Sequence, residues 1–321
     1  MLNSLLGGIP GSIDLGLLTG PMVLGVFISF KVLNFADLTV DGSFVTGGAV
    51  VATGIAAGMS PLLATLLGFF AGCAAGVITG LLNTLGGINP LLAGILTQIA
   101  LYSLNLRIMS IGGQDRSNIS LYGQKTLLSG LRDHFATWES VAVFLVIALV
   151  FWLLVTWFLG TNVGLGMQAT GDNETMARAQ GTASKGMLVA GLAISNGLVA
   201  LSGGLWAQYS GFADISAGIG TIVAGLASVI IGQAIFGAWP IWRAGLAALA
   251  GSVIYRVVIQ MAMTLGLKPT DMKIISALLV IAALLIPKLP VFQRFARARR
   301  EREIAKQVLA DDMAAAKEAI K

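Results

Sequence analysis

Charged residues are scarce in this chain. They make up 11% of its 321 residues, whereas a soluble domain carries about 25%. Hydrophobic residues make up 56% of the chain, and the mean hydropathy is +0.86. A water-soluble fold of this length could not bury so much apolar surface. The composition therefore excludes an ordinary soluble domain and predicts an integral membrane protein.

Histidine and cysteine are almost absent, since His134 and Cys73 are the only ones. A Cys/His metal cluster and an internal disulfide are therefore excluded, and a histidine-based triad has little to build on. The sequence also lacks the Gly-Lys-Ser/Thr of a phosphate-binding loop, the Gly-x-Ser-x-Gly elbow and the His-Glu-x-x-His pair. We predict that the chain is not an enzyme and holds no metal, ATP or other cofactor of its own, with His134 on the surface.

Long apolar runs are abundant instead. Stretches of roughly twenty residues with almost no charge recur along the chain, and each could cross a hydrocarbon layer of about 30 Å as a helix. Their unbroken apolar character favours helices over barrel strands. The sequence predicts an all-α, polytopic transmembrane bundle of about eight to ten helices. We place nine spans, at 12–30, 43–59, 61–83, 88–110, 138–160, 186–207, 218–238, 240–264 and 273–289.

Two regions orient the predicted bundle. The segment 161–185 is polar, and the chain after Pro287 is rich in Lys and Arg, which stay on the cytoplasmic side of a membrane. Four predicted helices separate these regions, so both are expected on the cytoplasmic face. The loops at 111–137 and 265–272 are then expected outside, and the same count places the N-terminus outside.

The chain divides into two parts by composition. Residues 1–290 form the predicted transmembrane domain, and 291–321 form a charged, helical cytoplasmic tail. The basic residues of this tail would either bind anionic lipid or dock a protein partner.

Polar residues interrupt the apolar sequence between the first two spans. Carboxylates within a membrane are costly, and Asp37 and Asp41 lie in this stretch. The stretch is a broken, re-entrant segment that lines a cavity, a plain cytoplasmic loop, or a helix cap formed by Asp or Ser. On the first interpretation the residues of a translocation pathway are Asn34, Phe35, Asp37, Thr39, Asp41 and Ser43.

Glycines recur every four residues in the third predicted span, at Gly68, Gly72, Gly76 and Gly80. On a helix this spacing places them on one face, where the missing side chains let a second backbone approach closely. The stripe predicts tight helix packing, either within this chain or between two subunits.

A short polar helix is predicted between the fifth and sixth spans. Residues 174–180 are good helix formers, Asp172 or Asn173 can cap the first turn, and Gly181 suits the end. A transporter driven by a separate ATPase needs such a protruding element to pass motion to its membrane helices. Any cytoplasmic loop can hold a two-turn helix, so the pattern alone does not identify one.

The same segment resembles the coupling-helix motif of permeases in the branched-chain amino-acid and ribose importer family. That motif pairs a glycine and an alanine with a downstream Gly-x-Asn and Ala-x-x-x-Gly. Residues 33–36, Leu-Asn-Phe-Ala, resemble a stretch near the start of the branched-chain amino-acid permeases, and 225–251 resembles the later core region. The likeness extends over most of 15–290. The matching motif positions are Gly164, Ala169, Gly171, Asn173, Ala177 and Gly181.

The resemblance implies contacts to an ATPase along this helix. Arg178 would donate charge-assisted hydrogen bonds to the ATPase groove, or would simply be a positive charge at the cytoplasmic face. The residues expected to couple to the ATPase are Gly171, Asp172, Asn173, Glu174, Ala177, Arg178 and Gly181.

The resemblance further implies the permease subunit of a type II ATP-binding-cassette importer in a prokaryotic inner membrane. Its partners would be a second permease copy in a homodimer, two cytoplasmic ATPase subunits that carry ATP and Mg²⁺, an extracytoplasmic solute-binding protein and the lipid bilayer, but no nucleic acid. A small solute such as an amino acid would cross by alternating access. The chain departs from the amino-acid permeases after Ala36, where they often continue with His and Gly, and looks closer to a branch linked to aromatic amino acids.

A secondary transporter or channel is the alternative interpretation. In such a protein Asp14, Asp37 and Asp41 would titrate or bind an ion, as buried carboxylates do in proton relays. Copurification of an ATPase subunit would favour the importer over this alternative.

Overall fold

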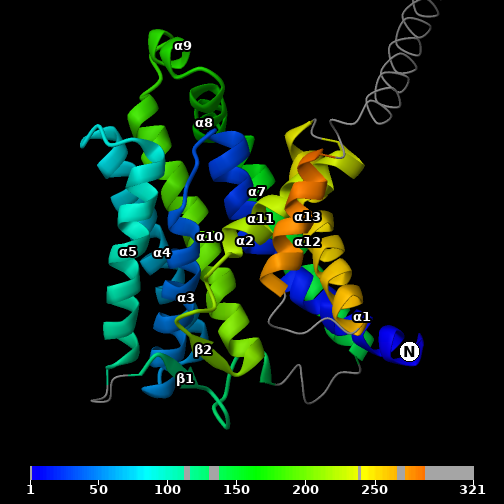
Figure 1. The fold of residues 1–321 in the computed structure, drawn as a ribbon. Coiled ribbons are helices and arrows are strands. Elements are labelled where there is room, and N and C mark those ends of the chain that lie inside the picture. The colour runs from blue at the N-terminus through cyan, green and yellow to red at the C-terminus, as the bar shows by residue number, and fades with distance from the viewer. Residues whose placement is uncertain (1, 112–115, 130–136, 238–239, 266–271, 286–321) are drawn as a thin grey trace, which may run out of the picture.

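Helices make up nearly all of the fold, and two short strands pair antiparallel (Figure 1). A computed structural model describes residues 2–111, 116–129, 137–237, 240–265 and 272–285; the predicted tail and His134 lie outside them. The prediction of an all-α helical bundle is confirmed.

The elements are α1 (Leu2–Leu18), α2 (Gly20–Phe27), the π-helix η1 (Ile28–Val32), α3 (Thr39–Ala56), α4 (Pro61–Thr84), α5 (Pro90–Met109), β1 (Asn118–Ser120), α7 (Thr137–Leu159), α8 (Asn162–Asp172), α9 (Glu174–Ala179), α10 (Ser184–Ser210), β2 (Phe212–Asp214), α11 (Thr221–Phe236), α12 (Ile241–Thr264) and α13 (Met272–Leu285).

Helix length and hydropathy agree with a membrane protein. Within the described residues, α4, α5, α7, α10 and α12 are each long and apolar enough to cross a bilayer, and α1 with α2 forms one further bent span. Helix α11 is apolar but has only 16 residues. At about 1.5 Å per residue it is shorter than a hydrocarbon layer of about 30 Å.

The first predicted span, 12–30, is bent in the structure. The helical segments Gly8–Leu18 and Gly20–Val32 meet at 42°. Pro21, near the start of α2, has no N–H to give and its ring disfavours a continuous helix. The Thr19 hydroxyl donates to the Leu15 carbonyl oxygen over 2.9 Å. Apolar periodicity could not predict this bend, because both halves remain apolar.

The two ends of the bundle differ (Figure 1). Helices α8 and α9 lie at one end, here called the α9 end. The N-terminus, β1 and β2 lie at the opposite end, here called the strand end. Helix α13 runs back to the α9 end, so the polar segment 161–185 and the end of α13 share one end, as the helix count predicts.

A short sequence, Phe-Ala-Asp, occurs twice and marks an internal repeat. It follows η1 at residues 35–37 and follows α10 at 212–214. In both copies the preceding residue has a left-handed backbone: φ is +50° at Asn34 and +79° at Gly211. In both copies the aspartate Oδ1 accepts the N–H two residues on, over 2.9 Å in the first and 2.7 Å in the second.

The elements that follow each copy correspond as well. One helix comes first (α3 or α11), then a 24-residue helix led by a proline (α4 or α12), then a further helix (α5 or α13). Figure 1 shows α2 running towards the α9 end and α10 running away from it. The two halves are therefore related as an inverted repeat, the arrangement found in many transporters.

The two halves of the chain contact each other at Asp41. Its carboxylate lies in the first turn of α3 and accepts the Gly220 and Ile222 N–H groups and the Thr221 hydroxyl, at 3.0, 2.8 and 2.9 Å. Asp41 therefore caps the N-terminus of α11, where a negative charge is favourable. A Cβ on Gly218 would lie 2.2 Å from the Asp41 carbonyl oxygen, so only glycine fits at this contact.

Helix α10 is the central helix of the fold and packs against α4, α3 and α2. The glycine stripe of α4 lies against it within this chain. A Cβ on Gly72 would meet the Asn196 carbonyl oxygen at 2.4 Å, and one on Gly76 the Leu192 carbonyl oxygen at 2.2 Å. Gly80 faces Val189, and Gly68 faces Val51 and Gly47 of α3. The two backbones are thus as close as the missing side chains allow.

Candidate functional site

Helices α8 and α9 form a capped projection at the α9 end. The Asn173 side chain accepts the Met176 N–H over 3.0 Å and so caps α9. At the other end, Gly181 has φ +83°, its N–H donates to the Arg178 carbonyl oxygen, and the Thr182 N–H donates to the Ala177 carbonyl oxygen. These two bonds form a Schellman motif, so α9 is terminated at both ends by its own sequence.

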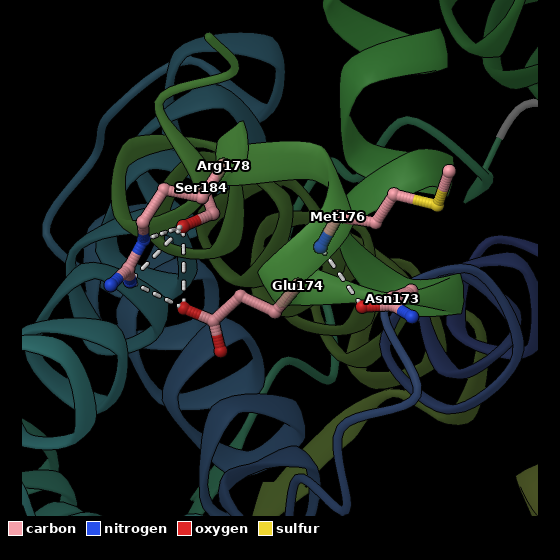
Figure 2. Close-up of polar contacts among 5 residues, drawn as sticks. All are labelled: Asn173, Glu174, Met176, Arg178 and Ser184. Atoms are coloured by element: carbon pink, nitrogen blue, oxygen red, sulfur yellow. Dashed lines mark hydrogen bonds and ion pairs between the residues drawn. The ribbon is translucent and has the colours of Figure 1, made fainter. Parts of the chain in front are cut away.

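The Arg178 side chain is held by its neighbours (Figure 2). Its Nη2 lies 2.8 Å from the Glu174 Oε1, and the Ser184 hydroxyl donates to the same oxygen over 3.2 Å. The two ionised side chains are 58% and 54% exposed, so this pair contributes little to stability. The bonds orient the guanidinium and leave other N–H groups available to a partner.

Met176 is an exposed apolar residue at the same projection. Its side chain is 62% exposed, and Figure 2 shows it pointing away from Arg178, Glu174 and Ser184. The sequence analysis did not single it out, although a large apolar side chain in a polar segment is a usable signal. Methionine is common at surfaces that bind helices and grooves of other proteins.

The projection is connected to the broken segment of the first half. A Cβ on Gly171 of α8 would lie 1.9 Å from the Val32 carbonyl oxygen and 2.9 Å from the Leu33 Cα. Helix α8 therefore touches the end of η1 directly. Ala177 is the buried residue of α9, whereas Asp172 and Asn173 are exposed.

Three of the predicted pathway residues, Asp37, Thr39 and Ser43, lie in or beside a buried polar network. The Asp37 carboxylate accepts the Asn196 amide of α10 over 2.6 Å, and the Ser43 hydroxyl donates to the Asn196 Oδ1 over 2.7 Å. The hydroxyls of Thr39 and Thr79 lie 2.7 Å apart. Phe35 is buried in the apolar core, and Asn34 is exposed.

The network includes a residue that the sequence analysis missed. Asn196 joins residues from both halves of the chain, and it is fully buried. An asparagine within an apolar span is a signal of a polar contact inside a bundle, and this one was available in the sequence.

Asp41 borders a cavity of about 360 Å³ between α3, α5 and residues 215–219. The N-termini of α3 and α11 lie beside it, and a helix N-terminus carries partial positive charge. The Asn105 Oδ1 has no hydrogen-bond partner among the described residues, although its amide donates to the Gly42 carbonyl oxygen over 3.3 Å. The polar residues that line the cavity are Asp41, Gln98, Tyr102, Ser103 and Asn105.

Comparison with known proteins decides the family. Residues 12–286 match the model of the branched-chain amino acid transport system permease component. The chain belongs to this permease family. It is 39% identical over 281 residues to the tyrosine transport system permease protein of Clostridioides difficile, covering 87% of this chain and 91% of that protein. It is 36% identical over 189 residues to an uncharacterised protein of Rickettsia prowazekii, covering 59% of this chain and 64% of that one. No solved structure matches this chain.

Membership in this family confirms the resemblance seen in the sequence. The permease is a multi-pass protein of a prokaryotic inner membrane and a component of a transport system rather than an enzyme. The similarity to a tyrosine permease is consistent with the aromatic branch of the family.

The permease carries a pH-sensitive turn at the strand end. Burial alone would raise the pKa of Asp214, but hydrogen bonds from the Ser216 hydroxyl and N–H and from the Asn118 amide outweigh it and lower this pKa. A lowered pKa in the folded state adds stability that is complete above the ordinary value of 3.8 and is lost as the pH falls through the folded value. We expect the protection of residues 116–122 from hydrogen exchange, corrected for intrinsic rates, to fall as the pH drops from about 5 to about 3.

The matched variant for this experiment is Asp214→Asn, which removes the titrating group. In this variant the protection of residues 116–122 from hydrogen exchange is expected to stay constant over the same pH range. Wild-type protection that stays constant across the range would contradict the prediction.

Proposed function

We propose that this chain is the permease subunit of an ATP-driven importer that moves an aromatic amino acid. Its partners are a second permease copy, two ATPase subunits that carry ATP and Mg²⁺, and an extracytoplasmic solute-binding protein. The observation that carries the proposal is the capped α8–α9 projection, which rests on η1 through Gly171. Family membership and the tyrosine permease relative support it.

The proposal places the α9 end in the cytoplasm. Helix α13 ends there, and the sequence after Pro287 is rich in Lys and Arg. Basic residues close to the ends of spanning helices remain in the cytoplasm. The strand end then faces the solute-binding protein.

Motion would pass from α9 to the pathway through direct contacts. A rotation of the projection displaces α8, and α8 presses on Val32 and Leu33 at the end of η1. The next residues, 34–38, carry Asp37, which is bonded to Asn196 of the central helix. Rigid, hydrogen-bonded elements of this kind can carry two discrete arrangements from one site to another.

The pathway is proposed to include the cavity beside Asp41. Tyr102 and Ile99 line it and are more than half exposed, so it reaches the outer surface of α5. Polar residues such as Gln98 and Ser103 are costly against lipid. A second copy over this face would enclose them, and the pathway would lie between the two subunits.

The docking test uses the complex of permease and ATPase in nanodiscs. We expect Met176→Asp and Arg178→Glu each to weaken ATPase binding, because each changes an exposed side chain at the tip of α9. A residue at the centre of an interface contributes about 2 kcal/mol or more, which corresponds to a loss of affinity of roughly 30-fold. Binding of labelled ATPase is measured by titration, and ATP hydrolysis is measured in the same samples.

Lys185→Glu is the matched control, since Lys185 is an exposed cation on α10 just beyond the projection. It is expected to retain most of the affinity. Stable permease that binds no ATPase even as the wild type would contradict the importer and favour a secondary transporter. Equal losses in all three variants would show that charge alone, rather than α9, sets the affinity.

A further inference from the structure

A second cavity of the permease lies at the strand end, away from the cavity at Asp41. It has a volume of about 680 Å³ and lies between α1, α7, α10 and α12, beside the loop of residues 121–129. A volume of this size is within the range of small-molecule sites. On the proposed orientation it opens towards the side from which solute arrives.

One wall of this cavity carries a buried carboxylate. Asp14 of α1 is only 4% exposed, and its Oδ1 has no hydrogen-bond partner among the described residues. Buried polar atoms are nearly always hydrogen-bonded, and an isolated carboxylate is especially costly in an apolar bundle. This oxygen is therefore available to accept a hydrogen bond from a ligand that enters the cavity.

Arg256 of α12 lines the same cavity. Helices α1 and α12 run antiparallel, and a Cβ on Gly16 would lie 2.8 Å from the Val253 Cα, while one on Gly8 would lie 2.8 Å from the Gln260 Nε2. This register places Asp14 and Arg256 at the same level to within about one helical turn. They nevertheless form no ion pair in the described part of the chain.

Aromatic side chains from α7 and α10 also line this cavity. Phe144 of α7 and Tyr209 of α10 meet edge to face with ring centroids 5.6 Å apart, and Trp206 lines the cavity one turn along α10. Rings in such walls hold a further aromatic ring by edge or face contacts. The cavity thus combines one negative group, one positive group and an aromatic surface.

We propose that this cavity is an entry site for an amino-acid zwitterion with an aromatic side chain. Asp14 accepts hydrogen bonds from the ammonium group, Arg256 donates to the carboxylate, and Phe144, Trp206 and Tyr209 hold the ring. A zwitterion fits better than a simple ion, because a simple ion would leave one of the two charges unpaired. The proposal rests on the proposed function and assigns the permease its own selectivity for the substrate, in addition to that of the binding protein.

The test is protection of a single cysteine in the complete transporter in nanodiscs. Cys73 is changed to serine, and Gly11→Cys is the reporter, because Gly11 lines the cavity and a Cβ there meets nothing within 4 Å. We expect L-phenylalanine to halve the rate of maleimide modification at about 1 mM, a weak affinity suited to a site that must release its solute. Phenethylamine and 3-phenylpropionate, which each lack one charged group, are expected not to protect at this concentration.

Arg256→Gln and Asp14→Asn are expected to abolish protection by L-phenylalanine, whereas Arg256→Lys and Asp14→Glu are expected to retain part of it. Lys125→Gln removes an exposed cation from the same end and is expected to change nothing. Ser117→Cys, an exposed reporter at the strand end outside the cavity, is expected to react at the same rate with and without the amino acid.

Absence of protection in the wild type, or protection that survives both Arg256→Gln and Asp14→Asn, would overturn the site. ATP-driven uptake of labelled L-phenylalanine by the same protein in proteoliposomes separates the two proposals. Uptake without protection removes the entry site and leaves the importer standing. No uptake of labelled L-phenylalanine or L-tyrosine, in the presence of the binding protein, rejects the aromatic substrate and with it both proposals.

Discussion

A Gly76→Val permease is expected to be recovered in much smaller amounts as a folded, monodisperse protein. The new Cβ would lie 2.2 Å from the Leu192 carbonyl oxygen and 2.8 Å from the Ala193 Cα, and both are backbone atoms that cannot turn aside. Helix α4 would have to move away from α10, the central helix of the fold. Overpacking of this kind costs about 1 to 3 kcal/mol, a large share of a total stability of about 5 to 15 kcal/mol.

The measurement is fluorescence-detected size-exclusion chromatography of the tagged protein before and after heating. It gives the amount of monodisperse protein that remains at each temperature. The matched control is Gly186→Val in α10, where a Cβ meets nothing within 4 Å. Both variants make the same change in helix propensity, so the difference between them reports the close approach of α4 and α10. Equal midpoints of thermal inactivation in the two variants would contradict the tight packing derived from the glycine stripe.

Asp37→Ala is expected to destabilise the permease and to abolish uptake. The substitution leaves the buried Thr39 N–H without its acceptor and takes one partner from the Asn196 amide. A buried donor without a partner costs about 1 to 3 kcal/mol. Asp37→Asn is expected to be damaging as well, because its own amide would then face the amide of Asn196.

The exchange of the two residues tests the role of the carboxylate. In the double variant Asp37→Asn, Asn196→Asp, one carboxylate and one amide still face each other, and the Ser43 hydroxyl still has an acceptor. We expect the double variant to regain stability and uptake relative to either single variant, and the exposed Asp172→Asn to behave as the wild type. A stable double variant without uptake would show that the position of the charge matters, as it would in the alternative secondary transporter.

Apolar runs predicted the long helices well, because a helix that must satisfy its own backbone in lipid leaves a continuous pattern. The short helix predicted at 174–180 is present as Glu174–Ala179, since its cap residues act locally. Helix α8 was not predicted. It contains Gly164, Gly166 and Gly171, which disfavour a helix, and packing of Gly171 against η1 outweighs that preference.

Contacts between segments far apart in the sequence could not be predicted from local sequence patterns. Asp41 caps a helix whose first residues lie about 180 positions further along the chain, so no local pattern could assign that role. The Phe-Ala-Asp repeat was visible in the sequence, but its meaning depends on the opposite directions of α2 and α10. The cavity between α1 and α12 likewise depends on a helix pairing that composition does not encode.

Helices α3 and α11 also constrain how the protein is made. A segment enters the bilayer alone only when it is long and apolar enough to span it, and α11, with 16 residues, is too short. Helix α3 packs most extensively against α10, which is synthesised only after α4, α5 and α7. During translation α3 therefore has no permanent neighbour on that side. Ser43 of α3, and Asp37 just before α3, are without Asn196 until α10 has been made. The buried polar network is therefore completed late in biogenesis, when α10 joins the first half of the chain.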